Sequence, residues 1–166
     1  QLLPLNPNDG SIISKVNSFV DKKHLKFMFD RVLPRTLYGI ESNFVEENPL
    51  KVTELTDGYI LKPNEIKLFA NDKAGKAGRS KWYVADKSII ESGKEYLSEW
   101  QVVVSSANAG GQKRDNQIEI IDNHSAFGRS RVALGSFKTE KEAVNFYHYC
   151  KTTLIRFMFL MTDEAL

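Results

Sequence analysis

Short basic stretches in this chain have the composition of a nucleic-acid contact. The sequence KAGKAGRSK, residues 73–81, holds four cations and no acid, and GQKR (111–114) and GRSR (128–131) follow it. Glycine lets a backbone approach phosphate groups closely, while flexible cationic side chains neutralise them. The net charge of the chain is only +2, which alone does not indicate a nucleic-acid partner. The hypothesis therefore depends on how the charge is distributed.

Recognition of a double helix divides into phosphate contacts, which position the protein, and base-edge contacts, which carry sequence information. Arginine and lysine donate to guanine O6 and N7, and the amides of asparagine and glutamine pair with adenine. We predict phosphate contacts from the first basic stretch, that is, from Lys73, Lys76, Arg79 and Lys81. The candidate contacts to base edges are Arg79, Ser106, Asn108, Gln112, Lys113, Arg114, Gln117, Arg129 and Arg131.

A polar loop over residues 105–117 is the predicted base reader. Its sequence SANAGGQKRDNQ carries almost no apolar side chain. A loop of that length inside a compact domain is usually functional or disordered. A solvated connection without a partner stays open as an alternative, as does plain surface charge for the GRSR turn.

A metal-dependent nuclease is an alternative because it needs an acid followed by an acid-x-Lys pattern on a strand. Asp57 with Glu65 and Lys67 matches that pattern loosely. About two such acid-x-Lys pairs are expected by chance in a chain of this composition, so the match is weak. The histidines lie in separate elements without helical metal spacing, and the single cysteine, Cys150, sits in an apolar segment. We therefore predict no metal site and no catalytic residue.

The elements that must position these residues form a predicted α+β fold. Ser11 is the expected N-cap of a helix, a second apolar group ends at Pro34, and residues 1–34 form an N-terminal helical segment. Residues 35–166 form the recognition domain, with short helices around Gly93 and a C-terminal helix that starts with a Thr139–Glu142 capping box and breaks near Thr152. The expected strands cover residues 59–61, 66–70, 81–85, 100–105, 118–121 and 131–135.

We expect a small mixed or antiparallel sheet with long loops and with the N- and C-terminal helices packed on it. Trp82 and Tyr83 alternate across one strand, so one of them faces the core. The large area of an indole favours Trp82, but which of the two is exposed stays open.

The composition places limits on the compartment. A lone cysteine offers no disulfide framework, which fits a reducing cytoplasm. No uncharged apolar run reaches the length of a membrane helix, and the first residues lack the pattern of a signal peptide. We predict a soluble cytoplasmic chain, and its start at Gln1 suggests a boundary inside a larger protein.

The order of three segments resembles a known family. These are RSKWYV (79–84), EWQVVVSSANAG (99–110) and VALGSFKTEKEAVNFYHYCKTTLIRFMFLM (132–161). Together they resemble the C-terminal recognition region of Eco57I-like and TaqI-like N6-adenine DNA methyltransferases of type II restriction-modification systems. The resemblance extends over residues 38–161, thins upstream, and is most specific in the last segment.

The resemblance implies a target-recognition domain that binds double-stranded DNA in a sequence-specific way. Its partner would be the methyltransferase catalytic domain of the same polypeptide, which would hold S-adenosylmethionine, whereas this fragment would hold no cofactor. Adenine methyltransferases grip the flipped base with an Asn-Pro-Pro-aromatic turn. Neither Asn6-Pro7 nor Asn48-Pro49 continues into that turn, so the fragment is expected to be non-catalytic. The alternative hypothesis is that the chain is an α+β protein-interaction module whose aromatic C-terminal helix packs on a partner.

Overall fold

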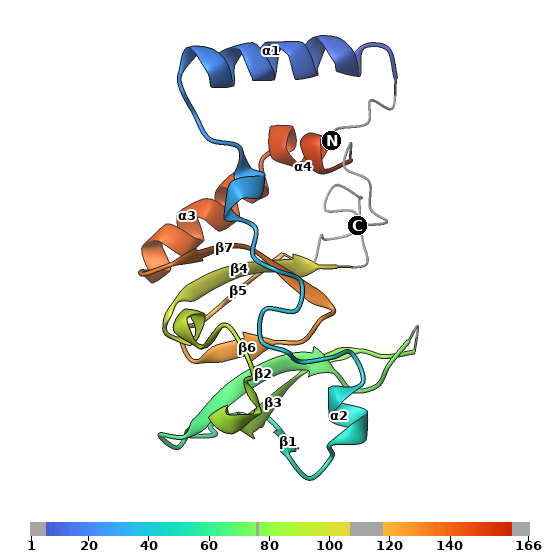
Figure 1. The fold of residues 1–166 in the computed structure, drawn as a ribbon, viewed down its shortest axis with the longest axis vertical. Helices are drawn as coiled ribbons and strands as arrows, with labels where there is room; N and C mark the ends of the chain where they lie inside the picture. Colours follow the sequence, from blue (N-terminus) through green and yellow to red (C-terminus); the bar gives the residue numbers. More distant parts are fainter. Residues whose placement is uncertain (1–5, 76, 107–117, 161–166) are drawn as a thin grey trace.

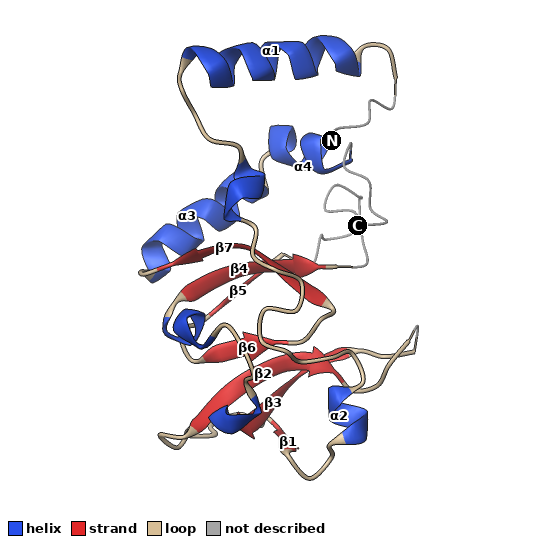
Figure 2. Cartoon of the chain, viewed as in Figure 1, coloured by secondary structure: helices blue, strands red, loops and turns tan. Residues whose placement is uncertain are grey.

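Two small β-sheets occupy the lower part of the molecule in Figures 1 and 2, and the longer helices, from the N- and C-terminal regions of the chain, lie above them. The computed structural model describes residues 6–75, 77–106 and 118–160. The strands are β1 (Val52–Glu54), β2 (Glu65–Asn71), β3 (Ser80–Asp86), β4 (Trp100–Ser105), β5 (Glu119–Ile121), β6 (Ser125–Phe127) and β7 (Arg131–Phe137). The α-helices are α1 (Asp9–Lys22), α2 (Phe44–Glu47), α3 (Glu140–Cys150) and α4 (Thr153–Leu160). Short 3-10 helices are η1 (Met28–Arg31), η2 (Lys87–Ile89) and η3 (Lys94–Ser98). The α+β class is confirmed.

The first sheet has the strand order β1-β3-β2-β6. β2 and β3 form an antiparallel hairpin in which Glu65 pairs with Asp86 and Asn71 with Ser80, whereas β6 runs parallel to β2. Both hairpin strands are rich in β-branched and aromatic residues, which suit a pleated, buried surface. The predictions of strands over 66–70 and 81–85 are therefore confirmed, and each strand extends slightly beyond the predicted range.

The second sheet is antiparallel, with the order β5-β4-β7. β4 spans the predicted range, and its consecutive valines place Val102 and Val103 fully in the interior. α3 packs on this sheet, where Ala143 and Cys150 join Val102 in a second core (Figure 1). Burial raises the pKa of the Cys150 thiol to about 12, as expected for a core residue and not for a nucleophile.

Two strands differ from the sequence-based expectation. Residues 59–61, predicted as a strand, are irregular, and β1 at 52–54 pairs with β3 instead. β6 was not predicted, because three residues are too few to show an alternating pattern. The expected single sheet is therefore two sheets, one mixed and one antiparallel.

The C-terminal helix begins and breaks where the sequence indicates. Thr139 Oγ1 accepts from the Glu142 amide at 3.3 Å, and Glu142 Oε2 accepts from the Thr139 amide at 3.1 Å, which completes the capping box. α3 ends at Cys150, and Thr152 Oγ1 donates to the carbonyl of Tyr149 at 2.8 Å before α4 starts. Both predictions are confirmed.

The N-terminal region differs more. α1 begins at Asp9 after Asn8, and Ser11 lies inside its first turn, where its Oγ donates to the Asn8 carbonyl at 2.9 Å. Ser11 is therefore not the N-cap. α1 lies at one end of the molecule beyond α4, not on either sheet, which corrects the expected packing of the N-terminal helix (Figure 1). None of the described helices is long and apolar enough to span a membrane.

The exposed fractions of Trp82 and Tyr83 show which of the two side chains is more deeply buried. Tyr83 is 6% exposed and faces the first core, so Tyr83 rather than Trp82 takes the fully buried position. Trp82, the next residue along β3, is half-buried and also packs against the first core, where it stacks on Phe69 with ring centroids 4.7 Å apart.

Candidate nucleic-acid interface

The described residues of the basic stretch, 73–75 and 77–81, lie in the turn of the β2–β3 hairpin and in the first residues of β3. Lys73 and Arg79 are exposed in this turn. The carboxylate of Asp72 accepts from the Arg79 amide at 2.8 Å, and this hydrogen bond lowers the pKa of Asp72. The Asp72 carboxylate thus stabilises the turn through the backbone of Arg79. The side chains of Lys73 and Arg79 face solvent.

Glycines determine the shape of this turn. Gly75 adopts a φ of +80°, in the left-handed region that favours glycine. A Cβ at Gly78 would overlap the carbonyl oxygen of Lys73, so a larger residue cannot occupy this place without opening the turn. These two glycines therefore permit the tight backbone turn that carries Lys73 and Arg79.

Replacing Gly78 by alanine should destabilise the protein by about 1–3 kcal/mol, because the turn must open. Thermal unfolding measures the effect. Gly10→Ala is the matched control, since a Cβ at Gly10 meets no atom within 4 Å. Equal behaviour of the two variants would contradict the constraint at Gly78.

Lys81 is less available than the turn residues. It lies on β3 next to β1, where its Nζ is 3.5 Å from a carboxylate oxygen of Glu54. Both side chains are exposed, so the pair is screened by solvent and adds little stability. A phosphate would have to compete with Glu54 for Lys81.

The GRSR turn, residues 128–131, is fixed by backbone hydrogen bonds to two other segments. The Gly128 amide donates to the carbonyl of Phe69 at 3.0 Å, and the Arg129 amide donates to the carbonyl of Ile40 at 2.9 Å. Ile40 and Phe69 both belong to the first core. The main chain of the turn is therefore rigid although the side chain of Arg129 is exposed.

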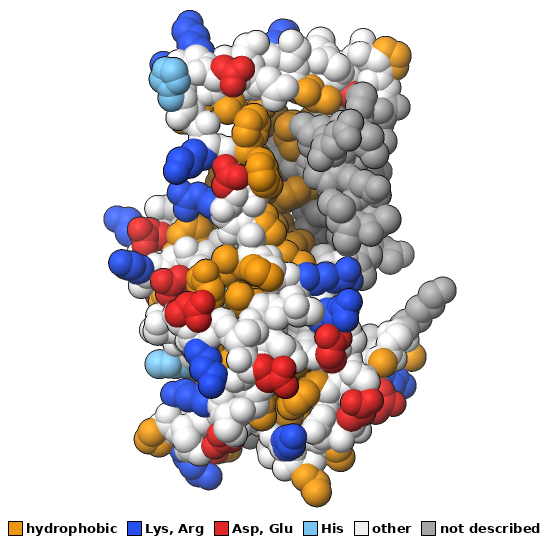
Figure 3. Space-filling model, viewed as in Figure 1, with side chains coloured by type: hydrophobic (Ala, Val, Ile, Leu, Met, Phe, Trp, Pro, Cys, Tyr) orange, Lys and Arg blue, Asp and Glu red, His pale blue; other side chains and the backbone are white. Residues whose placement is uncertain are grey.

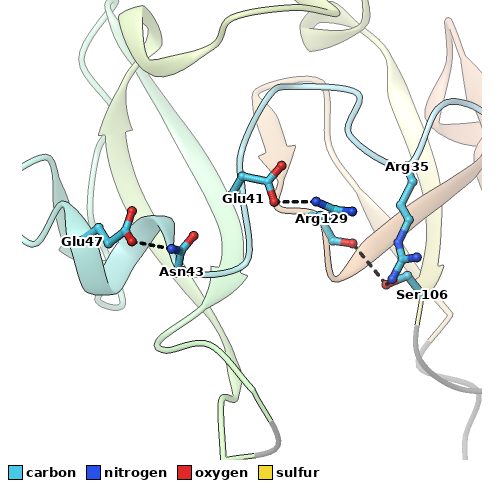
Figure 4. Close-up of polar contacts among 6 residues, drawn as sticks. All are labelled: Arg35, Glu41, Asn43, Glu47, Ser106 and Arg129. Atoms are coloured by element: carbon cyan, nitrogen blue, oxygen red, sulfur yellow. Dashed lines mark hydrogen bonds and ion pairs between the residues drawn. The ribbon is translucent and has the colours of Figure 1, made fainter.

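Four residues from three distant segments meet beside this turn, and we refer to them as the Arg35 cluster (Figure 4). Ser106 Oγ donates to the carbonyl of Arg129 at 3.1 Å and accepts from Arg35 Nη2 at 3.4 Å. Glu41 Oε2 accepts from Arg129 Nη1 at 2.9 Å. Of the predicted site residues, the fold thus brings Ser106 and Arg129 into direct contact.

Arg131, the last residue of the GRSR turn, points into the interior, which corrects the prediction that it contacts DNA bases. It is only 5% exposed, its guanidinium carbon lies 4.7 Å from the centroid of the Phe69 ring, and its Nη2 donates to Ser80 Oγ at 3.1 Å. Burial lowers the pKa of this guanidinium. Arg131 therefore joins the two sheets from the inside and is not placed to contact bases.

The Arg35 cluster and the β2–β3 turn share one edge of the molecule. Arg131, at the start of β7, pairs with Ser105 at the end of β4 and also contacts Ser80, the first residue of β3 after the turn. Ser106 is the last described residue before 107–117, the segment predicted to read bases. The root of that segment, the GRSR turn and the hairpin turn are thus neighbours.

Acidic residues are interspersed with the cations of this edge. Asp72 and Glu46 accept from amides of the hairpin turn, the latter from Ala74 at 3.1 Å, and Glu41 accepts from Arg129. Figure 3 likewise shows acidic and basic side chains alternating over this face of the molecule. The edge offers separate cations in fixed positions, and not a broad field of one sign.

Sequence reasoning missed Arg35 and Glu41. Neither lies in a basic stretch or a motif, and Arg35 meets Ser106 across 71 positions of the chain. No signal in the sequence could have joined them. The remaining predicted contacts, Lys76, Asn108, Gln112, Lys113, Arg114 and Gln117, lie outside the described residues.

Glu65 and Lys67 of the loose nuclease pattern each have a structural partner in the fold. Glu65 accepts from the Tyr59 hydroxyl at 3.0 Å and from the Lys62 amide at 2.9 Å. Lys67 instead forms an ion pair with Asp122. Within the described parts of the chain, no three His, Cys, Asp or Glu side chains are grouped closely enough to hold a metal ion.

Asp122 is a structural carboxylate. Desolvation raises its pKa, but hydrogen bonds from Lys67, Ser125 Oγ (2.6 Å) and the His124 amide (3.1 Å) outweigh that effect, and the net pKa is lowered. These bonds tie the turn before β6 to β2, the strand that carries Lys67.

Asp122→Asn should reduce the free energy of unfolding by about 1–3 kcal/mol at neutral pH, because bonds to the charged carboxylate are lost. Since the folded pKa lies below the unfolded value of about 3.9, this stabilisation is complete above pH 4–5 and disappears as the pH falls through the folded pKa. Urea unfolding between pH 7 and 2 should show the two proteins converging in acid. A constant difference at every pH would contradict this account, and Asp57→Asn, in an exposed turn, is the control.

Comparison with known proteins returned no family model, no curated protein and no solved structure that matches this chain.

Proposed function

We propose that this chain reads sequence in double-stranded DNA, as the target-recognition domain of an adenine-specific DNA methyltransferase of a restriction-modification system. The observation that carries the proposal is the Arg35 cluster, which joins segments around residues 35, 106 and 129 at the root of the loop expected to read bases. Binding sites on loops that a rigid scaffold positions are common in recognition proteins.

The exposed cations divide into two roles. Lys73 and Arg79 in the hairpin turn and the exposed Arg35 contact phosphates and fix the register of the protein on the duplex. Arg129, held on a rigid turn, faces base edges in the major groove. Lys81 contributes less to phosphate binding, because it already forms an ion pair with Glu54.

The chemistry belongs to another part of the parent polypeptide. A methyltransferase must extrude its target adenine into a pocket beside S-adenosylmethionine, so the recognition domain holds the duplex while a catalytic domain receives the base. This chain alone therefore transfers no methyl group and binds no cofactor. We place the protein in the cytoplasm, in keeping with its free, buried thiol.

Titration of labelled duplex DNA with this chain over a range of salt concentrations tests the proposal. A DNA-binding domain gives a logarithmic affinity that falls linearly with the logarithm of salt concentration, by about 0.9 for each phosphate contact. Absence of binding at low salt, or binding without salt dependence, would contradict the proposal.

A protein-interaction module is the second candidate, and one observation favours it. Large apolar side chains are exposed in the N-terminal segment, where apolar atoms are visible below α1 (Figure 3). They are Ile12, Phe19, Leu25, Phe27, Phe29 and Val32. By contrast, the apolar residues 157–159 of α4, which sequence reasoning assigned to a partner, are half-buried. A module of this kind would bind a protein through α1 and η1 and would ignore DNA.

A further inference from the structure

The ion pair between Arg129 and Glu41 is the least expected feature of the Arg35 cluster. An acid beside the best base-reading cation repels phosphate, and an exposed pair contributes little to stability. The side chains of Arg129 and Glu41 are 46% and 53% exposed, so both remain accessible to a ligand. A role in recognition would explain why a carboxylate stands there.

Both side chains project from fixed backbone. The Arg129 amide donates to the carbonyl of Ile40, the residue that precedes Glu41, and Ile40 is only 1% exposed. The two Cα positions are therefore held side by side by the first core, while the ends of the side chains reach solvent. Rigid stems with accessible polar ends are what a specific contact requires.

The chemistry of the pair matches one base pair. In the major groove a G·C pair presents the acceptors O6 and N7 of guanine next to the N4 donor of cytosine. Arg129 Nη1 and Glu41 Oε2 are joined at 2.9 Å, so the pair likewise presents a donor group beside an acceptor group. Guanine is the base whose O6 and N7 an arginine can contact with two N–H donors, and a carboxylate can accept from cytosine N4.

We infer that Arg129 and Glu41 read a single G·C pair together, with Arg129 donating to guanine and Glu41 accepting from cytosine N4. The inference rests on the proposed function and deepens it. Glu41 is thus a specificity residue and not a stabilising one. A guanidinium keeps further N–H donors when one is bound to a carboxylate, so the pair need not break to bind DNA.

Selection from a pool of duplexes with a randomised centre tests this inference. The wild-type chain should enrich a motif that contains a G·C pair, and Glu41→Leu and Arg129→Ala should each lose preference at that same position, roughly tenfold. Leucine is similar in size to glutamate but has no acceptor for cytosine N4, and thermal unfolding verifies that the variant folds. The matched control is Glu54→Leu in the exposed Lys81 pair, which should leave the motif unchanged.

Other outcomes separate the possibilities. If Glu41→Leu keeps the wild-type motif and binds all duplexes more tightly, Glu41 only repels phosphate and the inference is overturned. Loss of preference at different positions in the two variants would also overturn it. If the wild-type chain binds duplexes but enriches no motif, the inference fails while DNA binding stands. If the wild-type chain retains no duplex, the proposed function itself fails.

Discussion

Replacing Phe127 by alanine should lower the free energy of unfolding by about 3–5 kcal/mol, a large share of the stability of a domain of this size. Phe127 ends β6, is 2% exposed, and packs edge-on against Tyr38 with ring centroids 5.2 Å apart. Alanine would remove buried apolar area and leave a cavity that the surrounding sheet can close only in part. Urea unfolding monitored by tryptophan fluorescence measures the change.

The same substitution should also weaken the candidate interface. Gly128 and Arg129 follow Phe127 directly, so a loosened β6 no longer holds the turn that presents Arg129. Phe29→Ala is the control, because Phe29 is 73% exposed and its removal leaves no buried cavity. If both variants unfolded at the same urea concentration, β6 would not be part of the core.

The second large effect concerns Arg131. Arg131→Ala should cost about 2–3 kcal/mol of stability, since it removes a desolvated cation over the Phe69 ring and a hydrogen bond to Ser80. Arg129→Ala, at an exposed ion pair two residues earlier, should cost less than about 1 kcal/mol. Thermal unfolding of both variants measures the difference.

Methionine at position 131 separates packing from charge. Arg131→Met keeps an unbranched apolar stem in the buried site, so it should recover part of the stability lost in alanine. At a temperature low enough for Arg131→Ala to remain folded, this alanine variant should bind DNA with the same salt dependence as the wild type. An alanine variant that is fully stable but has lost one phosphate contact would show that Arg131 reaches DNA.

Local signals predicted much of the fold. The valine run of β4 and the Thr139–Glu142 capping box act over a few residues, and each was found where the sequence indicates. β6 could not be predicted, because this short strand depends on parallel pairing with β2, a segment distant in the sequence. The first turn of α1 was misassigned because Asn8 and Ser11 are both acceptable caps by type.

The candidate site was only partly predictable for the same reason. Residue type identified Ser106 and Arg129, but types alone could not separate the exposed Arg129 from the buried Arg131 in one short turn. Burial of Arg131 follows from its place opposite Ser105 and above Phe69, which is a tertiary relation. Arg35 and Glu41 enter the site through contacts across long sequence separations, which carry no local pattern.

The central claim is that the edge formed by the Arg35 cluster and the hairpin turn faces the phosphates of a duplex. The most direct measurement is the logarithmic salt slope of duplex binding for the wild type, Arg35→Ala/Arg79→Ala and a charge-matched control. Lys138→Ala/Lys141→Ala serves as the control, because both lysines are exposed beyond the far end of β7, about 20 Å from Arg131 along the strand.

We expect Arg35→Ala/Arg79→Ala to reduce the magnitude of the slope by about 1.8, two phosphate contacts, and the lysine pair to leave it unchanged. Equal slopes for all three proteins, or an equal reduction in both variants, would contradict the claim that this edge is where DNA binds.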